Sequence, residues 1–234
     1  MIGEVWAWFA DPANWQGEEG VLNRLVEHTL LTVTATVVAV LVGLPLAVWL
    51  GHRGRGGFLA INVSNVGRAI PVFAVLLLLS LGPLGSAYFG PYGRAGLATL
   101  VALVLFALPP IITNAYVGMR EVDRDTVEAA RGMGMTETQL LRGVELPLAM
   151  PLIVNGIRLA VVQVWATATI AALVAGPGLG RIITLGFVRQ DIAMVVAGAL
   201  LAGGIALLLE LGMAAVQSRL DPLPRTAGQL TARE

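Results

Sequence analysis

Long apolar stretches alternate with short polar ones along this chain, and the alternation predicts helices that cross a membrane. The apolar stretches cover about residues 29–50, 58–81, 97–119, 148–174 and 192–216. Each is at least as long as the roughly 20 residues that an apolar helix needs to span a bilayer. The pattern therefore predicts an all-α, polytopic membrane protein with about five spans, whose termini lie on opposite sides of the membrane.

Two of the predicted spans contain residues that interrupt a helix. In the second, polar residues and Gly67 precede Pro71, so we expect a kink or break between them, and the third contains Pro109 and Pro110. Irregular backbone at membrane depth survives only against protein or a water-filled cavity, so nearby polar side chains are candidates to line a solute pathway. The candidate pathway residues are Asn65, Pro71, Asn114, Asn155, Gln163, Thr167 and Thr169. A proline kink that serves only helix packing is an equally good reading of each proline.

Three charged residues, Arg68, Arg158 and Glu210, lie inside the second, fourth and fifth predicted spans. At about 1.5 Å per residue, all three fall roughly 10 to 17 Å from the same membrane face. An unpaired charge near mid-bilayer costs roughly 2.5 to 3.5 kcal/mol on insertion scales. We therefore predict that Glu210 pairs with Arg158 or Arg68. A static pair that holds helices together is the simpler role, gating is the sharper one, and arginines that extend toward the membrane surface are a third alternative.

The arginines indicate the orientation, because positive residues gather in cytoplasmic loops. With the N-terminus outside, the cytoplasmic set outnumbers the outer set. The cytoplasmic set is Arg53, Arg55, Arg120, Arg124, Arg131, Arg142, Arg219, Arg225 and Arg233. The outer set is Arg24, Arg94, Arg181 and Arg189. We predict an outer N-terminus and a cytoplasmic C-terminus.

The two ends of the chain differ in character. Residues 1–26 contain Trp6, Trp8, Phe9 and Trp15, whose rings suit the headgroup layer, so we expect a short interfacial or periplasmic helix, with a disordered tail as the alternative. Residues 27–220 form the predicted transmembrane domain. Residues 221–234 form a predicted cytoplasmic tail.

The composition excludes several functions. It is 56% hydrophobic and 13% charged, against about 25% charged residues in soluble domains. There is no cysteine and there are only two histidines, His28 and His52, which excludes disulfides, thiol catalysis and a His/Cys metal cluster. Lysine is also absent, so no Gly-x-x-x-x-Gly-Lys phosphate loop exists. We expect no catalysis, no metal, no cofactor in this chain and no nucleic-acid partner.

The longest charged segment, residues 121–147, separates the third and fourth spans and predicts a helical elbow. Asp125 followed by Glu128, and Thr136 followed by Gln139, have the spacing of helix-starting capping boxes. Glycines supply the break between the two short helices, and Pro147 suits the first turn of the fourth span. Such an elbow can fit a groove on a soluble partner and move the spans as a lever. A solvated connector without a partner explains the same residues.

The elbow carries a motif that resembles one known family. Glu128-Ala129-Ala130, then Gly134, then Val144-Glu145-Leu146-Pro147 match the cytoplasmic signature of binding-protein-dependent ABC permeases of the type I importer class. The resemblance implies the transmembrane fold of that class and identifies the elbow as the coupling helix that docks on a separate ATPase. The residues it implies for coupling are Glu128, Ala129, Ala130, Gly134, Val144, Leu146 and Pro147.

Within that class, the chain is most similar to permeases for glycine betaine, choline and carnitine. The supporting stretches include residues 121–123, 128–135, 144–149, 156–158 and 167–169, whereas 65–72 and 175–180 differ from the family pattern. The resemblance implies import across a bacterial inner membrane by alternating access. It further implies two ATPase copies, which bind ATP and Mg, a second permease subunit, identical or paralogous, and an extracytoplasmic substrate-binding protein.

Other functions remain open at this stage. An amino-acid or other small-solute permease of the same class is the main alternative for the substrate. A free-standing secondary transporter or channel would work without an ATPase and would leave the elbow unexplained. A membrane enzyme lacks support, because neither His-Glu-x-x-His nor Gly-x-Ser-x-Gly occurs.

Overall fold

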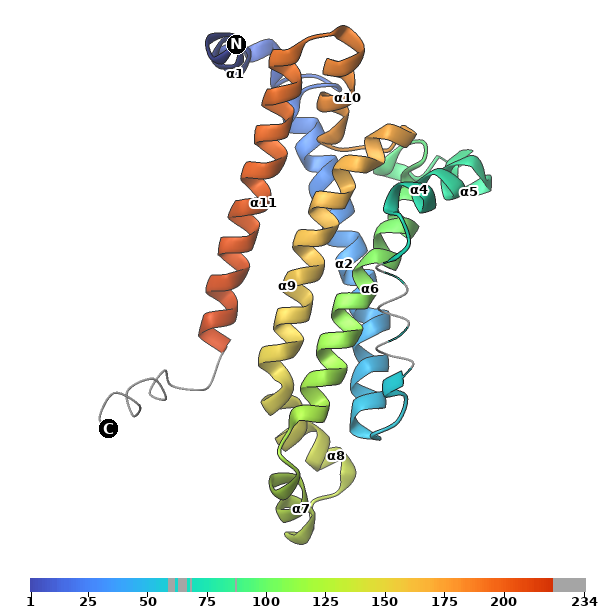
Figure 1. Cartoon of the computed structure of the whole chain (residues 1–234), viewed down its shortest axis with the longest axis vertical. Helices are drawn as coiled ribbons and strands as arrows, with labels where there is room; N and C mark the ends of the chain where they lie inside the picture. Colours follow the sequence, from blue (N-terminus) through green and yellow to red (C-terminus); the bar gives the residue numbers. More distant parts are fainter. Residues whose placement is uncertain (59–61, 63–66, 68, 87, 221–234) are drawn as a thin grey trace, which may run out of the picture.

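The computed structural model describes residues 1–58, 62, 67, 69–86 and 88–220, and in these residues it contains helices and no strand (Figure 1). The long helices are α2 (Val21–His52), α6 (Gly96–Glu121), α9 (Leu146–Ile170) and α11 (Ile192–Leu220). The shorter α-helices are α1 (Ile2–Ala10), α4 (Val72–Leu81), α5 (Pro83–Ser86), α7 (Arg124–Gly132), α8 (Glu137–Leu140) and α10 (Gly180–Arg189). Single turns are η1 (Pro12–Asn14), η2 (Gly90–Tyr92), the π-turn η3 (Leu141–Glu145) and η4 (Ala171–Val174).

Four helical segments are long and apolar enough to cross a membrane: Val21–His52, Gly96–Glu121, Glu137–Val174 and Ile192–Arg219. The expected second span, 58–81, falls partly outside the described residues. Its described end is α4, a shorter apolar helix that begins after an extended Pro71 (φ −62°, ψ 119°), where the sequence predicted a break. The all-helical membrane fold predicted from the hydrophobic pattern is confirmed.

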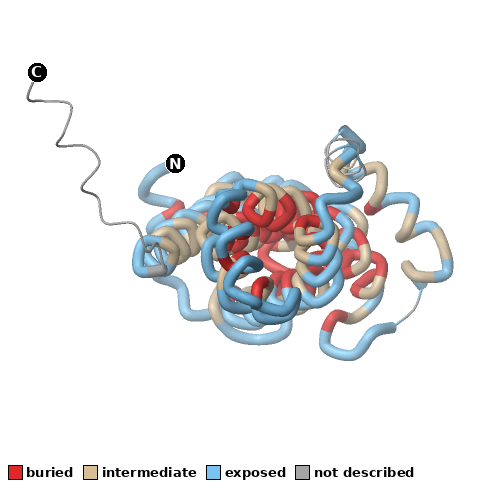
Figure 2. The backbone as a smooth tube through the Cα atoms, turned by 90° about the horizontal axis from the view of Figure 1, so that it is seen from below, coloured by how far each residue is buried: buried red, intermediate tan, exposed pale blue. Residues whose placement is uncertain are grey.

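The core of the molecule lies where α2, α6 and α9 pack side by side (Figures 1 and 2). Leu31, Leu103, Ile111 and Val164 are buried there among alanines from all three helices. Small residues let the backbones approach closely. A Cβ on Gly156 of α9, for example, would lie 2.8 Å from the carbonyl oxygen of Pro110 in α6.

Large apolar side chains cover the outer surfaces of the long helices and of α4. Leu41 is 69% exposed, Leu208 68% and Leu78 71%. A soluble protein rarely exposes so much apolar surface, whereas the hydrocarbon of a bilayer would cover it.

The N-terminal segment is ordered and docks at one end of α11 (Figure 1). Trp8 and Trp15 pack against a cluster that contains Val21, Ile182 and Met194. The indole of Trp15 donates to the carbonyl of Phe9 at 2.9 Å. The predicted N-terminal helix is therefore present, and the α7–α8 elbow projects from the opposite end of the bundle.

Candidate functional site

The first elbow helix, α7, is capped by Asp123. Its carboxylate accepts from the Thr126 hydroxyl at 2.9 Å and from the Asp125 amide at 3.3 Å. These bonds, the one from Thr126 above all, hold the pKa of the Asp123 carboxyl below its usual value. The sequence prediction that α7 begins with Asp125 and Glu128 is wrong, because Asp125 lies inside the first turn, where its side chain cannot cap.

The second elbow helix, α8, begins as predicted. The Thr136 amide donates to Gln139 Oε1 at 2.9 Å and the Gln139 amide donates to Thr136 Oγ1 at 3.4 Å, which completes a capping box. Between the two helices Gly134 has φ +85°, a conformation that favours glycine. Two caps and a glycine turn therefore define the shape of the elbow.

The elbow packs firmly on the bundle. Val127 and Ala130 of α7 and Leu140 of α8 are buried in a cluster with Met119 of α6 and Ile153 of α9. Ala130 is therefore an anchor of the elbow and is not part of its exposed face. Because apolar contacts join the elbow to both neighbouring helices, a force on the elbow reaches α6 and α9 together.

The face of the elbow that points away from the bundle is exposed. It includes Glu128, Ala129, Gly132 and Gly134 of the predicted motif. Beside it lies a shallow cavity of about 490 Å³, whose lining residues are Met135, Thr138, Gln139, Arg142 and Gly143. Small residues, a flexible methionine and a free arginine side chain suit a surface that accepts another protein.

The π-turn η3 makes α8 and α9 one continuous helical rod. It occupies Leu141–Glu145 and passes directly into α9, whose first turn holds Leu146 and Pro147. Val144 and Leu146 are half-buried, whereas Pro147 is exposed. π-turns inside helices occur mostly at functional sites.

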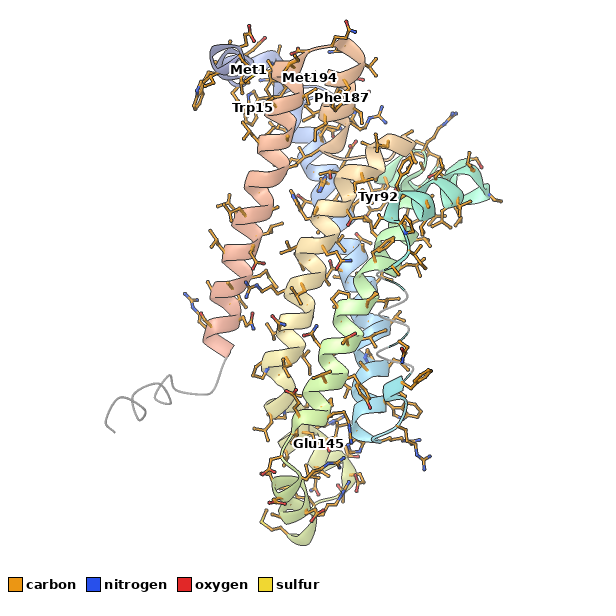
Figure 3. The ribbon with its side chains drawn as sticks, in the orientation of Figure 1. Met1, Trp15, Tyr92, Glu145, Phe187 and Met194 are labelled. Carbon is orange, nitrogen blue, oxygen red and sulfur yellow. The ribbon has the colours of Figure 1, made fainter. Side chains whose placement is uncertain are left out.

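A line of charged side chains crosses the elbow, and the sequence analysis missed it. Arg131 donates to both carboxylate oxygens of Glu137, each at 3.1 Å, and Glu137 holds the pKa of Arg131 above its usual value. Glu137 Oε2 lies 3.4 Å from His52 Nε2, and His52 Nδ1 is hydrogen-bonded to Glu145. Glu145 is buried at the junction of elbow and bundle (Figure 3). The sequence feature that could have indicated this line of charges was His52, a histidine directly after the first predicted span.

The predicted pathway residues in α6 and α9 hold these two helices together. Asn155 Nδ2 donates to Asn114 Oδ1 at 3.1 Å, and Asn114 Nδ2 donates to the Pro110 carbonyl at 2.8 Å. Gln163 Nε2 donates at 3.2 Å to the Phe106 carbonyl, which would accept from residue 110 if that residue were not proline. These contacts satisfy half-buried polar side chains along the α6–α9 interface.

The remaining pathway candidates occupy different surroundings. Thr167 is buried. Thr169 is half-buried and its hydroxyl donates to the Ala166 carbonyl at 2.6 Å. Pro71 is exposed at the start of α4, and Asn65 lies outside the described residues. A role of any of them in solute passage stays a prediction.

The charge pair predicted inside the membrane is present. Arg158 Nη2 contacts Glu210 Oε1, and Arg158 Nη1 donates to Gln217 Oε1 at 2.8 Å. The pair joins α9 to α11. Arg68, the other predicted partner, lies outside the described residues.

At the opposite end of the molecule, α2 holds the loop before α10. Glu27 Oε2 accepts from the Gly178 amide at 2.9 Å, and His28 Nδ1 accepts from the Leu179 amide at 3.2 Å. His28 Nε2 lies 3.0 Å from the Trp165 carbonyl, so it carries the proton. Sequence analysis had no signal for these contacts, which join segments about 150 positions apart along the chain.

Comparison with known proteins gives a consistent result. Residues 39–225 match the family model described as binding-protein-dependent transport system inner membrane component. The choline transport system permease protein OpuBB of Bacillus subtilis is 31% identical over 86% of this chain and 89% of its own length. The carnitine transport permease protein OpuCB of Listeria monocytogenes is 32% identical, covering 88% and 91%. The osmoprotectant import permease protein OsmY of Salmonella typhimurium is 34% identical, covering 83% and 80%.

Solved structures show the same fold. An inward-facing MetNI methionine ABC transporter chain matches with a TM-score of 0.72 and 23% identity, over 86% of this chain and 96% of that one. A chain of an amino acid ABC transporter crystallised with histidines matches with a TM-score of 0.68 and 21% identity, over 85% and 93%.

Proposed function

The chain belongs to the family of binding-protein-dependent transport system inner membrane components, it is a membrane permease subunit of an ABC importer, and we propose that its solute is a quaternary-ammonium osmoprotectant. Glycine betaine, choline and carnitine are the candidates. The observation that supports this substrate class is the match, over more than four fifths of the chain, to permeases for choline, carnitine and osmoprotectants.

An amino acid is the alternative solute. The structural similarity to methionine and amino acid transporters is at 23% and 21% identity, which indicates a shared fold and does not identify the solute. The sequence similarity to the osmoprotectant permeases is higher and favours the first candidate.

The α7–α8 elbow is the docking surface for the ATPase in this proposal. Its exposed Glu128, Ala129 and Gly134 face away from the bundle, and its buried Ala130 and Leu140 fasten it to α6 and α9. Closure of the ATPases around ATP and Mg would push on the elbow, and the firmly packed helices would tilt with it. The chain itself remains non-catalytic.

The assembly that fits this role contains two ATPase copies, a second permease subunit, identical or paralogous, and a substrate-binding protein. The elbow end lies in the bacterial cytoplasm and the α1 end outside, which agrees with the distribution of arginines. Pro71 is exposed and Thr169 half-buried on the single chain, so both are available to face a solute pathway shared with the second permease.

The experiment measures ATP hydrolysis by the complete complex of permease, ATPase and binding protein in proteoliposomes, with and without glycine betaine, choline or carnitine. We expect stimulation by at least one of the three. Glu128→Ala should abolish the stimulation and weaken ATPase binding, whereas the control Glu121→Ala, at the exposed end of α6, should do neither. An assembled complex that responds to an amino acid alone would overturn the substrate class, and failure of the wild type to bind any ATPase would overturn the docking role.

A further inference from the structure

His52 is the last residue of α2, and it lies between two carboxylates of the elbow rod, the continuous helical segment formed by α8, the π-turn and α9. Its Nδ1 is hydrogen-bonded to Glu145 in the π-turn, and its Nε2 lies 3.4 Å from Glu137 in α8. We propose that His52 is a positioning residue that ties α2 to the elbow, so that movement of the elbow is passed to α2. The proposal rests on the docking role proposed above.

The chain connectivity explains why α2 needs such a tie. The elbow is continuous with α6 at one end and with α9 through the π-turn at the other. α2 ends more than 70 positions before α7 begins, so no short stretch of backbone links it to the elbow. α2 can therefore follow the elbow only through non-covalent contacts. The contacts that His52 makes with Glu145 and Glu137 are polar and directional, so they constrain the position of α2 relative to the elbow.

The burial of Glu145 makes the contact with His52 costly to break. Glu145 is 6% exposed and the His52 side chain 15%. A buried carboxylate that loses its hydrogen-bond partner carries the penalty of an unpaired charge away from water. The pair therefore resists separation when the elbow moves.

The tie extends to both elbow helices. Glu137, which faces His52, also receives two hydrogen bonds from Arg131 of α7. Arg131 lies three positions after Glu128, so the two share one face of α7. A push on the exposed surface around Glu128 thus has a path of polar contacts through Arg131, Glu137 and His52 to α2.

The close packing beside His52 holds the end of α2 rigidly against its neighbours. A Cβ on Gly51 would lie 2.5 Å from the Cβ of Met119 in α6. Ala47, one turn earlier, is buried in the cluster that also contains Leu140 of α8. The end of α2 has little room to shift relative to α6 while the tie holds.

The test measures glycine betaine uptake and ATP hydrolysis in the same proteoliposomes with the complete complex. His52→Ala and Glu145→Leu each remove the tie, because neither replacement has a polar group that can hydrogen-bond the remaining partner. We expect both variants to assemble and to hydrolyse ATP, while the number of glycine betaine molecules imported per ATP falls about fivefold or more, the lower end of usual coupling between sites. The exchanged pair, His52→Glu with Glu145→His, keeps the two groups and should recover most of the ratio.

A matched control removes another polar contact of α2. The Tyr92 hydroxyl and Thr34 Oγ1 are 2.6 Å apart, far from the elbow, and Tyr92→Phe breaks this bond. The uptake ratio of this variant should equal the wild-type ratio. An unchanged ratio in both tie variants, or an equal fall in Tyr92→Phe, would overturn the tie. A wild type that binds no ATPase would instead overturn the docking role on which the tie rests.

A second readout does not depend on the solute. Because the chain lacks cysteine, spin labels can be placed at Arg124→Cys, at the start of α7 and outside the docking residues, and at Leu41→Cys on α2; both positions are exposed. In the otherwise wild-type complex, ATP with vanadate should leave the distance between the labels unchanged, because elbow and α2 move as one body. The added His52→Ala should make that distance change with nucleotide. A change already present with His52 in place would contradict the proposal, and so would an unchanged distance in His52→Ala.

Discussion

Arg158 of α9 and Glu210 of α11 form an ion pair across the interface of these two helices. Arg158 also donates to Gln217, about two turns further along α11 than Glu210. Three polar side chains inside apolar helices thus partner one another, as the low polarity of a bilayer favours, although Arg158 Nε is buried without a hydrogen-bond partner in the described part of the chain.

Loss of this pair should weaken the assembly of α11 with the bundle. Glu210→Gln leaves the guanidinium with a neutral partner, so we expect less assembled complex and a melting temperature several degrees lower in detergent. The reversed pair, Arg158→Glu with Glu210→Arg, should recover part of the loss. Size-exclusion chromatography and thermal melting check both, and an equal defect in the single and reversed variants would contradict a direct pair.

Gln163 should stabilise α6 at Pro110, where the proline has no amide hydrogen to donate to the Phe106 carbonyl. Gln163→Leu leaves the Phe106 carbonyl buried without its donor, and we expect a loss of about 1 to 3 kcal/mol in the free energy of unfolding. In a Pro110→Ala background the amide of residue 110 can bond that carbonyl, so the same change should cost less. Unfolding titrations in mixed micelles of the four proteins give the coupling between the two positions. Additive effects would contradict it.

Gly156 should tolerate no side chain. A Cβ there meets the Pro110 carbonyl and the Asn114 Cβ, both at 2.8 Å, and the carbonyl belongs to backbone that cannot turn aside. Gly156→Ala should therefore cost about 1 to 3 kcal/mol. Gly203→Ala, in α11, is the matched control, because a Cβ there meets nothing within 4 Å and removes the helix penalty of glycine. The same unfolding titration compares the two.

The cap of α7 should respond to acid. The pKa of Asp123 is lowered in the folded state by its hydrogen bonds with Thr126 and Asp125. A carboxyl of this kind stabilises the fold above its unfolded pKa, and that contribution is lost as the pH falls through the lower folded pKa. We expect the mobility of a spin label at Met133→Cys to rise only below about pH 4. Asp123→Asn keeps a neutral acceptor and should flatten this dependence.

The parts of this fold that depend on local pattern were predictable from the sequence. Apolar length identified the long helices, and the spacing of Thr136 and Gln139 identified a real capping box. The choice between Asp123 and Asp125 as the cap of α7 was not predictable, because the two lie two positions apart near the start of the same helix and both carboxylates can accept an amide hydrogen. Local pattern also predicted that Glu210 needs a partner without naming which arginine it would be.

Contacts between distant segments could not be predicted. His52 and Glu145 are 93 positions apart, and their meeting depends on how α2 packs against the elbow rod. Asn114, Asn155 and Gln163 were interpreted as pathway residues because polar residues in a span need a polar environment. That environment turned out to include each other and the carbonyls near Pro109 and Pro110, which periodicity alone does not reveal.

The π-turn sets the angular relation between the elbow and the span. Each residue of an α-helix turns the chain by about 100°, so one residue more or less between α8 and α9 changes which side of α8 lies over a given side of α9. The wide turn at Leu141–Glu145 absorbs one extra residue without breaking the rod. In this geometry Leu140 faces the bundle while Glu145 points at α2. Deleting Gly143 would convert the π-turn to an ordinary α-helical turn. The elbow would then be rotated about the axis of α9 and would present different side chains to α2, although every apolar residue of the span would stay in place.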